Sequence, residues 1–333
     1  MSAPERPTVL LFFEDFEQDR FVTGDRHVQR LLRRAVHRLR RGGQTTSGYQ
    51  VWFDSLVFAL RRAGCEVKVN DRRAAKRSPD HPVGVCGYPH IIDRWDLPNP
   101  AVLGPGLFDH PAQVPTLMDD PRFETYLTTC DWNHRLFAAH WDGCHPWFAG
   151  IDIDRWEDLS EHEATTDFLV YDKIRFDRSR MEQELLRPVL ARLEATGRTY
   201  EVLRYGGYDL DRYRALMSRS RALLFLCEHE TQGMAYQEAM ASGLPVLAWD
   251  NGVWLDPTAT RYQDDPVPAS SVPYFGPECG VTFAGADEFD DALDDFWSRV
   301  DTFEPRAWVA EHLSIAGSAE AYLRAYEPLL PER

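Results

Sequence analysis

Two glutamates in the second half of the chain have the spacing and setting of a ligand-binding pair. Glu230 and Glu238 are separated by seven residues, in the run Glu-Thr-Gln-Gly-Met-Ala-Tyr-Gln-Glu. The apolar run Ala222–Cys227 before them predicts a buried parallel strand, and the residues up to Ala241 have helical spacing. Two carboxylates across a strand-to-helix turn can face one crevice at the carboxyl edge of a parallel sheet, where a hydroxyl-rich ligand needs acceptors. The plainer alternative is a capping acid at Glu230 and a solvated helix residue at Glu238.

Gly233 and Met234 stand where this helix should begin. Glycine lets the backbone approach a ligand closely, and the free N–H groups of a helix N-terminus suit a phosphate. Gly243 occupies the position of a left-handed cap residue, and Pro245 prevents the helix from continuing. The stretch therefore predicts strand, polar loop, helix and strand, with a phosphate position at the start of the helix.

Three cations follow a second predicted strand, Asp167–Tyr171. They are Lys173, Arg175 and Arg178. Cations grouped after a strand can make charge-assisted contacts with a phosphate-bearing ligand. The alternative is ordinary solvated charge on a loop.

The pattern around Glu230–Glu238 resembles the donor-binding signature of retaining GT-B glycosyltransferases of the family 4 type. The shared features are the spacing of the glutamates, the glycine between them and the Glu-Ala-Met-Ala-Ser-Gly-Leu-Pro-Val run that follows. Gly150-Ile-Asp152 is similar to the family's entrance to its second domain. The family usually has an arginine and, five residues on, a lysine that contact the donor diphosphate. Lys173 and Arg178 hold these places here, with the two residue types exchanged.

The chain departs from the family pattern in the exchanged cations and in the residues beside the glycine. Because Arg175 is also available, which of Lys173, Arg175 and Arg178 contact the diphosphate stays open. Together with the positive end of the helix, these cations would stabilise the leaving diphosphate. Thr231-Gln232 stands where the family usually has an aromatic residue beside the glycine, so we expect an unusual fit to the donor sugar.

The resemblance implies a role for each glutamate. Glu230 would lie against the transferred sugar, and Glu238 would accept hydrogen bonds from the ribose hydroxyls. The amides near Gly233 and Met234 would assist. The family's front-face mechanism requires no enzyme nucleophile, and the sequence shows no Ser-His-Asp or Cys-His spacing that would supply one.

Two glycine-containing loops complete the donor site that the resemblance implies. Tyr205-Gly206-Gly207-Tyr208 follows a predicted strand at Tyr200–Arg204, where the family receives the nucleobase through backbone contacts. Gly43 belongs to a glycine-rich link, residues 42–48, before a predicted helix at 49–64. In the family, the corresponding loop faces the cleft between the two domains.

A histidine of the first domain often lies near the transferred sugar in this family. His110, in the loop after a predicted strand at residues 101–104, is the best positional match, and His90 and His134 compete with it. The alternative for a lone histidine in a loop is a surface residue. Asp152-Ile-Asp154 has the Asp-x-Asp form that holds Mn²⁺ in another glycosyltransferase fold, but its place in the linker predicts a turn.

The fold implied is α/β, of the GT-B type, with two doubly wound Rossmann-like domains facing a cleft. A chain of 333 residues has room for about two domains. We expect an acceptor-side domain over residues 1–150 and a nucleotide-sugar-binding domain over residues 151–309. Residues 310–333 would form a C-terminal helix that crosses back to the first domain.

The composition limits the kinds of partner and the cellular compartment that we expect. A formal net charge of −16 argues against nucleic-acid binding, and six scattered cysteines indicate reduced core residues. No apolar run reaches the roughly 18 residues of a membrane span. With an apolar N-terminal run too short for a signal sequence, these features predict a cytoplasmic protein.

Residues 26–41 predict a basic amphipathic helix, with arginines around an apolar stripe. Such a helix can hold a protein against anionic lipid, here at the inner face of the membrane, or bind an acidic acceptor. A solvated helix packed on its own domain is the alternative.

The activity implied is transfer of a sugar, with retention, from a UDP- or GDP-type sugar to a glycan, lipid-linked or small-molecule acceptor. No cofactor and no metal are expected. One alternative is a nucleotide-sugar epimerase or phosphorylase on the same frame. The other is a catalytically degenerate GT-B protein that acts as a partner or scaffold.

Overall fold

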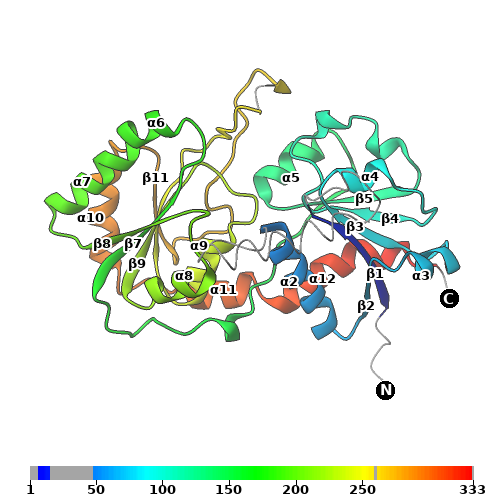
Figure 1. Cartoon of the computed structure of the whole chain (residues 1–333), viewed down its shortest axis with the longest axis horizontal. Helices are drawn as coiled ribbons and strands as arrows, with labels where there is room; N and C mark the ends of the chain where they lie inside the picture. The colour runs from blue at the N-terminus through cyan, green and yellow to red at the C-terminus, as the bar shows by residue number, and fades with distance from the viewer. Residues whose placement is uncertain (1–6, 16–47, 259–260, 332–333) are drawn as a thin grey trace. The chain divides into compact units, whose positions relative to one another are not determined.

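The computed structural model describes residues 7–15, 48–258 and 261–331. They form two compact units, each built on one parallel sheet (Figure 1). The first unit contains residues 7–15, 48–150 and 313–331, and the second contains residues 151–258 and 261–312. The predicted basic helix at 26–41 and Gly43 lie outside the described residues.

The first unit has six parallel strands in the order β2-β1-β3-β4-β5-β6. The strands are β1 (Thr8–Glu14), β2 (Glu66–Val69), β3 (Val83–Gly87), β4 (Ala101–Leu103), β5 (Phe123–Thr128) and β6 (Cys144–Pro146). The helices are α2 (Gly48–Arg62), α3 (Arg72–Arg77), α4 (His90–Asp93), α5 (Asp131–Ala138) and α12 (Ile315–Tyr326), with short 3-10 turns at Pro111–Gln113, Leu117–Asp119 and Glu327–Leu329.

Two short elements of this unit are not apparent from hydrophobic periodicity. The segment 71–82 contains α3, which begins because the Asp71 carboxylate accepts a hydrogen bond from the Ala74 amide at 2.9 Å. The strand β6 follows the helix α5. Three residues, one of them proline, are too few to give an alternating pattern.

The helix α12 belongs to the first unit although it lies at the end of the chain. The indole Nε1 of Trp147 donates to the Ser318 carbonyl at 3.1 Å, and the Ser318 hydroxyl donates to the Phe148 carbonyl at 2.8 Å. Tyr322 packs directly on the sheet, since a Cβ added at Gly84 of β3 would lie 1.9 Å from its hydroxyl oxygen. The sheet therefore needs glycine at position 84.

The second unit has five parallel strands in the order β11-β10-β9-β7-β8. The strands are β7 (Thr166–Lys173), β8 (Tyr200–Arg204), β9 (Ser220–Cys227), β10 (Val246–Trp249) and β11 (Gly280–Phe283). The helices are α6 (Arg178–Met181), α7 (Arg187–Ala195), α8 (Leu210–Met217), α9 (Met234–Ala241), α10 (Phe289–Arg299) and α11 (Pro305–His312), with a 3-10 turn at Ile153–Arg155 and a π-helical turn at Glu182–Leu186.

Alternate residues of the strand β7 face different helices. Phe168 and Val170 belong to the apolar cluster that contains residues of α7 and α10. Tyr171 faces the other side, where its ring lies 5.8 Å from that of Tyr213 in α8. Because side chains alternate along a strand, the next two residues, Asp172 and Lys173, also leave on opposite faces of the sheet.

Two helical stretches of the chain are interrupted. Residues 178–195 form α6, the π-helical turn and α7 in succession. Pro188 follows the wide turn, and a proline lacks the N–H for the regular helical bond and crowds the preceding turn. The helix expected at 310–330 is α11 and α12, and Ser314 caps α12 by accepting from the Gly317 amide at 3.1 Å. The second unit accordingly runs to His312, and not to residue 309.

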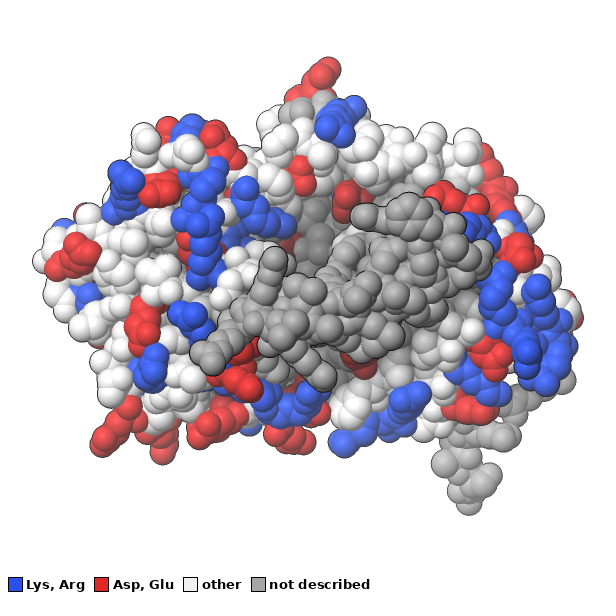
Figure 2. Space-filling model, in the orientation of Figure 1, with Lys and Arg blue, Asp and Glu red and all other residues white. Residues whose placement is uncertain are grey.

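The surface of the described residues carries charges of both signs. On the face shown in Figure 2, acidic and basic side chains are interspersed over both units. Among the described helices, none combines the length and the apolar composition needed to cross a bilayer.

Candidate active site at the carboxyl edge of the second sheet

Several of the candidate site residues, among them Lys173, Arg175 and Glu230, lie where β7 and β9 end. These strands are neighbours, and Lys173 of β7 pairs in register with Cys227 of β9. The chain leaves β7 towards β8 on one side of the sheet and leaves β9 towards β10 on the other. Parallel sheets bind ligands at such a point, because the loops that follow the two strands diverge and leave a crevice.

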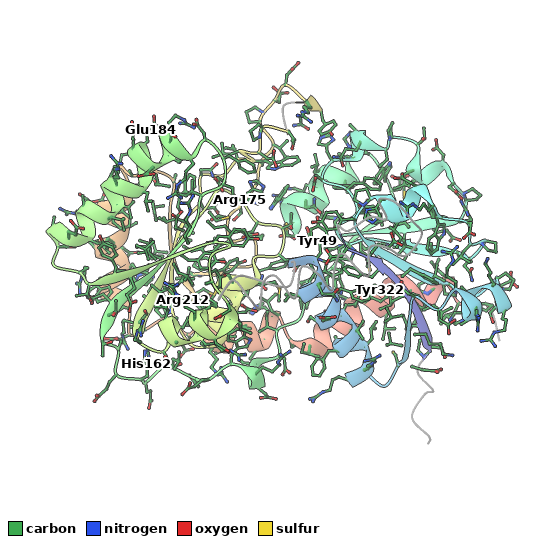
Figure 3. The ribbon with its side chains drawn as sticks, in the orientation of Figure 1. Tyr49, His162, Arg175, Glu184, Arg212 and Tyr322 are labelled. Carbon is green, nitrogen blue, oxygen red and sulfur yellow. The ribbon has the colours of Figure 1, made fainter. Side chains whose placement is uncertain are left out.

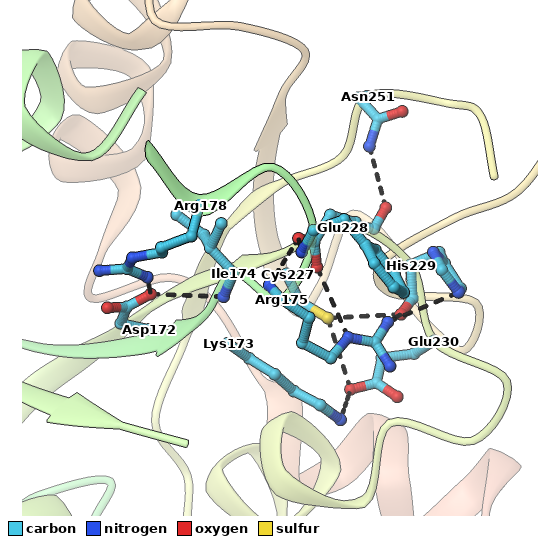
Figure 4. A network of polar contacts seen from close by, with 11 residues as sticks. Asp172, Lys173, Ile174, Arg175, Arg178, Cys227, Glu228, His229, Glu230 and Asn251 are labelled. Carbon is cyan, nitrogen blue, oxygen red and sulfur yellow. Dashed lines mark hydrogen bonds and ion pairs between the residues drawn. The ribbon is translucent and has the colours of Figure 1, made fainter. Parts of the chain in front are cut away.

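Lys173 and Glu230 meet at this point and form an ion pair (Figure 4). Their side chains are 14% and 11% exposed, so the charges are largely removed from water. Burial disfavours the ammonium, but the negative charge of Glu230 and its neighbours outweighs this, and the pKa of Lys173 lies above its ordinary value. The ammonium also lies 4.7 Å from the centre of the Tyr205 ring. The lysine predicted to bind the diphosphate is thus in direct contact with the glutamate predicted to lie against the sugar.

The helix α9 begins beside this pair, as the sequence predicted. Gly233 precedes it with φ 72° and ψ 39°, the left-handed conformation, and Met234 is its first residue. A Cβ added at Gly233 would lie 2.0 Å from the ring of Tyr236, so both backbone conformation and space require glycine. The Glu230 amide donates to the Ser270 carbonyl at 2.9 Å, which fixes the loop between β9 and α9.

Glu238 lies one turn further into α9 and is partly buried. Burial raises the pKa of its carboxyl to about 8, against the opposing effect of Arg214 and Arg155. The charge of Glu238 also contributes to raising the pKa of the buried hydroxyls of Tyr208 and Tyr213. It therefore borders the loop at residues 205–208 and the helix α8.

The loop after β8 contains both exposed and buried tyrosines. Tyr205 is 41% exposed, whereas Tyr208 is buried and its hydroxyl lies 2.5 Å from that of Tyr171. Gly206 has φ 80° and no atom near its Cβ position, and Gly207 has only the Arg204 carbonyl within contact distance. The backbone at these two glycines is therefore accessible beside the aromatic rings of Tyr205 and Tyr208.

Arg175 and Arg178 lie apart from one another. The Arg175 guanidinium donates to the His229 carbonyl at 3.1 Å, and its position on the loop after β7 can be followed in Figure 3. Arg178 is ion-paired with Asp172, a residue that is only 3% exposed. The structure therefore brings Lys173, Arg175 and Glu230 together and turns Arg178 to a different carboxylate.

The three candidate histidines of the first unit have separate surroundings. His110 is 1% exposed and caps the turn at Pro111–Gln113, where its Nδ1 accepts from the Ala112 amide at 3.1 Å. His134 Nδ1 lies 3.2 Å from the Thr128 hydroxyl oxygen. His90, by contrast, is paired through Nε2 with the Glu14 carboxylate at 3.1 Å, at the end of β1. His110 is thus a buried capping residue and not the surface histidine given as the alternative.

Asp152 and Asp154 stand at a 3-10 turn, Ile153–Arg155, in line with the predicted turn. In the described part of the chain, no group of three or more histidine, cysteine, aspartate or glutamate side chains is arranged to hold a metal ion. Two surface hollows of about 540 and 660 Å³ share Arg221 and Asp301, near the amino ends of the strands, and lie away from Lys173 and Glu230.

Three residues of the site were missed from the sequence. Glu228 accepts hydrogen bonds from the amides of Arg175 and Phe176, Asp172 pairs with Arg178, and His229 stacks on Phe176 with ring centroids 6.0 Å apart. Burial and the nearby Arg175 and Lys173 charges lower the pKa of His229 to about 3, so its ring is neutral at ordinary pH. A signal was present, because all three residues stand at or just after the end of a predicted strand.

The sequence matches no protein-family model and none of the curated proteins at a significant level. Solved structures do match over nearly the whole chain. AviGT4, a glycosyltransferase involved in avilamycin A biosynthesis, is 14% identical with a TM-score of 0.55, covering 97% of this chain and 98% of that one. The lipopolysaccharide outer core galactosyltransferase WaaB is 10% identical with a TM-score of 0.56, covering 97% and 100%. Sucrose-phosphate synthase from Thermosynechococcus elongatus is 12% identical with a TM-score of 0.54, covering 97% and 99%. The chain has the GT-B glycosyltransferase fold, with two Rossmann-like domains.

Proposed function

We propose that this protein is a retaining glycosyltransferase of the family 4 type that uses a UDP- or GDP-type sugar as donor. The observation that carries the proposal is the Lys173–Glu230 ion pair at the switch point of the second sheet, beside the N-terminus of α9. A cation and free helix amides suit the diphosphate, and the carboxylates of Glu230 and Glu238 suit the hydroxyls of the sugar and ribose. The glycosyltransferase neighbours favour this reading over an epimerase or a scaffold.

The reaction we propose breaks the bond between the anomeric carbon and the β-phosphate oxygen. The acceptor hydroxyl forms the new bond on the same face, and its proton passes to the departing phosphate oxygen. Lys173 and the α9 amides stabilise the charge that accumulates on the diphosphate. Glu230 orients the sugar, and no residue of the chain is covalently modified.

The reaction needs no metal or cofactor, since cationic side chains and amides perform the neutralisation. A glycan, a lipid-linked sugar or a small molecule is the acceptor. Residues 26–41 contact anionic lipid, and the protein works in the cytoplasm or at the inner face of the membrane.

Thermal-shift measurements on the full chain with UDP, GDP and their sugars test the donor assignment. A true donor nucleotide at about 100 times its Kd stabilises the protein by about 2.7 kcal/mol and raises its Tm by several degrees. Lys173→Met and Glu238→Ala should abolish most of that shift. Arg187→Ala, which removes an exposed cation on α7, should retain it. A wild-type Tm that does not respond to any of the nucleotides contradicts the proposal.

A further inference from the structure

The three cations after β7 do not form one cluster. Asp172 leaves the strand on the face packed by α7 and α10, and Arg178 is paired with it there. Lys173 leaves on the other face, towards Glu230 and α9. The resemblance to the family pairs Lys173 with Arg178, but these two side chains are held on opposite faces of the sheet.

Arg175 reaches the side on which Lys173 lies. Its guanidinium Nη2 donates to the His229 carbonyl at 3.1 Å, one residue before the Glu230 that pairs with Lys173. Figure 4 shows both cations directed towards the loop after β9, with Arg178 turned away to Asp172. The charge of Arg175 also acts on the pKa of Lys173, whereas the pKa of Arg178 is raised chiefly by its hydrogen bond to Asp172.

Glu228 holds Arg175 in this position. Its side chain is 1% exposed, and its Oε1 accepts from the backbone amides of Arg175 at 2.6 Å and Phe176 at 2.8 Å. Its Oε2 lies 3.6 Å from the Arg175 Nε. A buried carboxylate is costly unless it is hydrogen-bonded and paired. Here the two backbone amides donate to Oε1 and the Arg175 guanidinium supplies the opposite charge.

We propose that Lys173 and Arg175 are the two cations that hold the donor diphosphate, and that Glu228 is a positioning residue that sets Arg175 in place. This inference rests on the proposed function. Arg178 neutralises the buried Asp172 at the end of β7 and so maintains the strand end from which Lys173 projects. Arg175 thus takes the place that the family pattern gives to the residue at position 178.

Titration calorimetry of the full chain with UDP and with GDP tests the choice of cations. Arg175→Ala should weaken binding of the nucleotide that the wild type binds by about 10- to 100-fold, because a charge-assisted contact to phosphate is lost. Arg178→Ala should weaken binding less and should lower the Tm, because Asp172 loses its counter-charge. Arg187→Ala serves as the matched control on an exposed arginine and should bind as the wild type does. Weaker binding in Arg178→Ala than in Arg175→Ala overturns the assignment.

A double-mutant cycle tests the role of Glu228. Glu228→Gln keeps one acceptor oxygen for the amides and removes the charge, so the variant should fold. It should raise the KM for the donor several-fold, and its effect on kcat should be smaller. Combined with Arg175→Ala, it should add no further loss, because Glu228 acts through Arg175. Losses that add in the double variant overturn the positioning role. A wild type that binds neither nucleotide contradicts the proposed function itself, whereas binding that is indifferent to Arg175 contradicts only this inference.

Discussion

The buried acids of the candidate site differ in how their charge is compensated. Glu230 has the Lys173 ammonium, and Glu228 has two backbone amides and a guanidinium. For the Glu238 carboxylate, burial outweighs the compensating charges of Arg214 and Arg155 and raises its pKa from 4.5 to about 8. A desolvated carboxyl such as this one is suited to accept hydrogen bonds from the hydroxyls of a ligand. In the free protein, its desolvation lowers the free energy of unfolding.

This cost should appear as a pH dependence of stability. The folded protein binds a proton at Glu238 more tightly than the unfolded chain does, so the free energy of unfolding falls as pH rises from about 4.5 to about 8. Glu238→Gln removes this dependence, and its Tm should exceed that of the wild type by a margin that grows with pH over that range. Melting curves of both proteins between pH 5 and pH 8.5 measure the margin. A constant margin would show that Glu238 is not buried in the way described.

For single residues, the sequence predicted which charged side chains belong to the site better than it predicted which carboxylate each cation pairs with. The spacing of Glu230 and Glu238 and the helix start at Gly233 could be read directly. The separation of Lys173 from Arg178 could not, because the predicted strand ended at Tyr171 and the observed strand continues to Lys173. Those two extra residues set which face of the sheet each side chain takes.

At the scale of the element, the turn from β9 into α9 depends on one glycine. Gly233 has positive φ, and its Cβ position is occupied by the Tyr236 ring. Tyr236 is fully buried and its hydroxyl accepts from the Tyr274 amide at 3.0 Å, so the ring is held in place. The start of α9 is therefore specified by steric contact as well as by conformation.

Two glycine substitutions separate these contributions. Gly197 also has positive φ, 70°, but no atom lies within 4 Å of its Cβ position. Gly197→Ala should cost about 1 kcal/mol of unfolding free energy, the left-handed penalty alone. Gly233→Ala should cost about 3 kcal/mol or more, because the Tyr236 ring must move as well. Urea denaturation of both variants measures the difference, and equal costs would mean that the ring accommodates the added methyl group.

Most strands and helices could be predicted from apolar runs and their periodicity. The exceptions have local causes that hydrophobic pattern does not report. The helix α3 begins at an aspartate cap, the π-helical turn precedes Pro188, and Ser314 separates α11 from α12. Caps and a proline change where an element begins or ends without changing which face is apolar.

In the whole molecule, two sheets that share the order second, first, third, fourth and fifth strand account for the GT-B likeness at only 10–14% identity. Each sheet begins with the order second strand, first strand, third strand, which places a switch point between the first and third strands of each unit. In the second unit this point carries Lys173 and Glu230. In the first unit it carries Glu14 and His90, a pair that the sequence could not reveal because its members are far apart along the chain.

We propose that the protein transfers a sugar from a nucleotide donor with retention, and the anomer released on donor hydrolysis tests this directly. Proton NMR of the full chain incubated with each α-linked UDP- or GDP-sugar follows the sugar that slow donor hydrolysis releases, before it mutarotates. With its true donor, we expect the α anomer to appear first and Lys173→Met to suppress its release. First appearance of the β anomer, or release that is unaffected by Lys173→Met, would contradict a retaining transferase with Lys173 at the diphosphate.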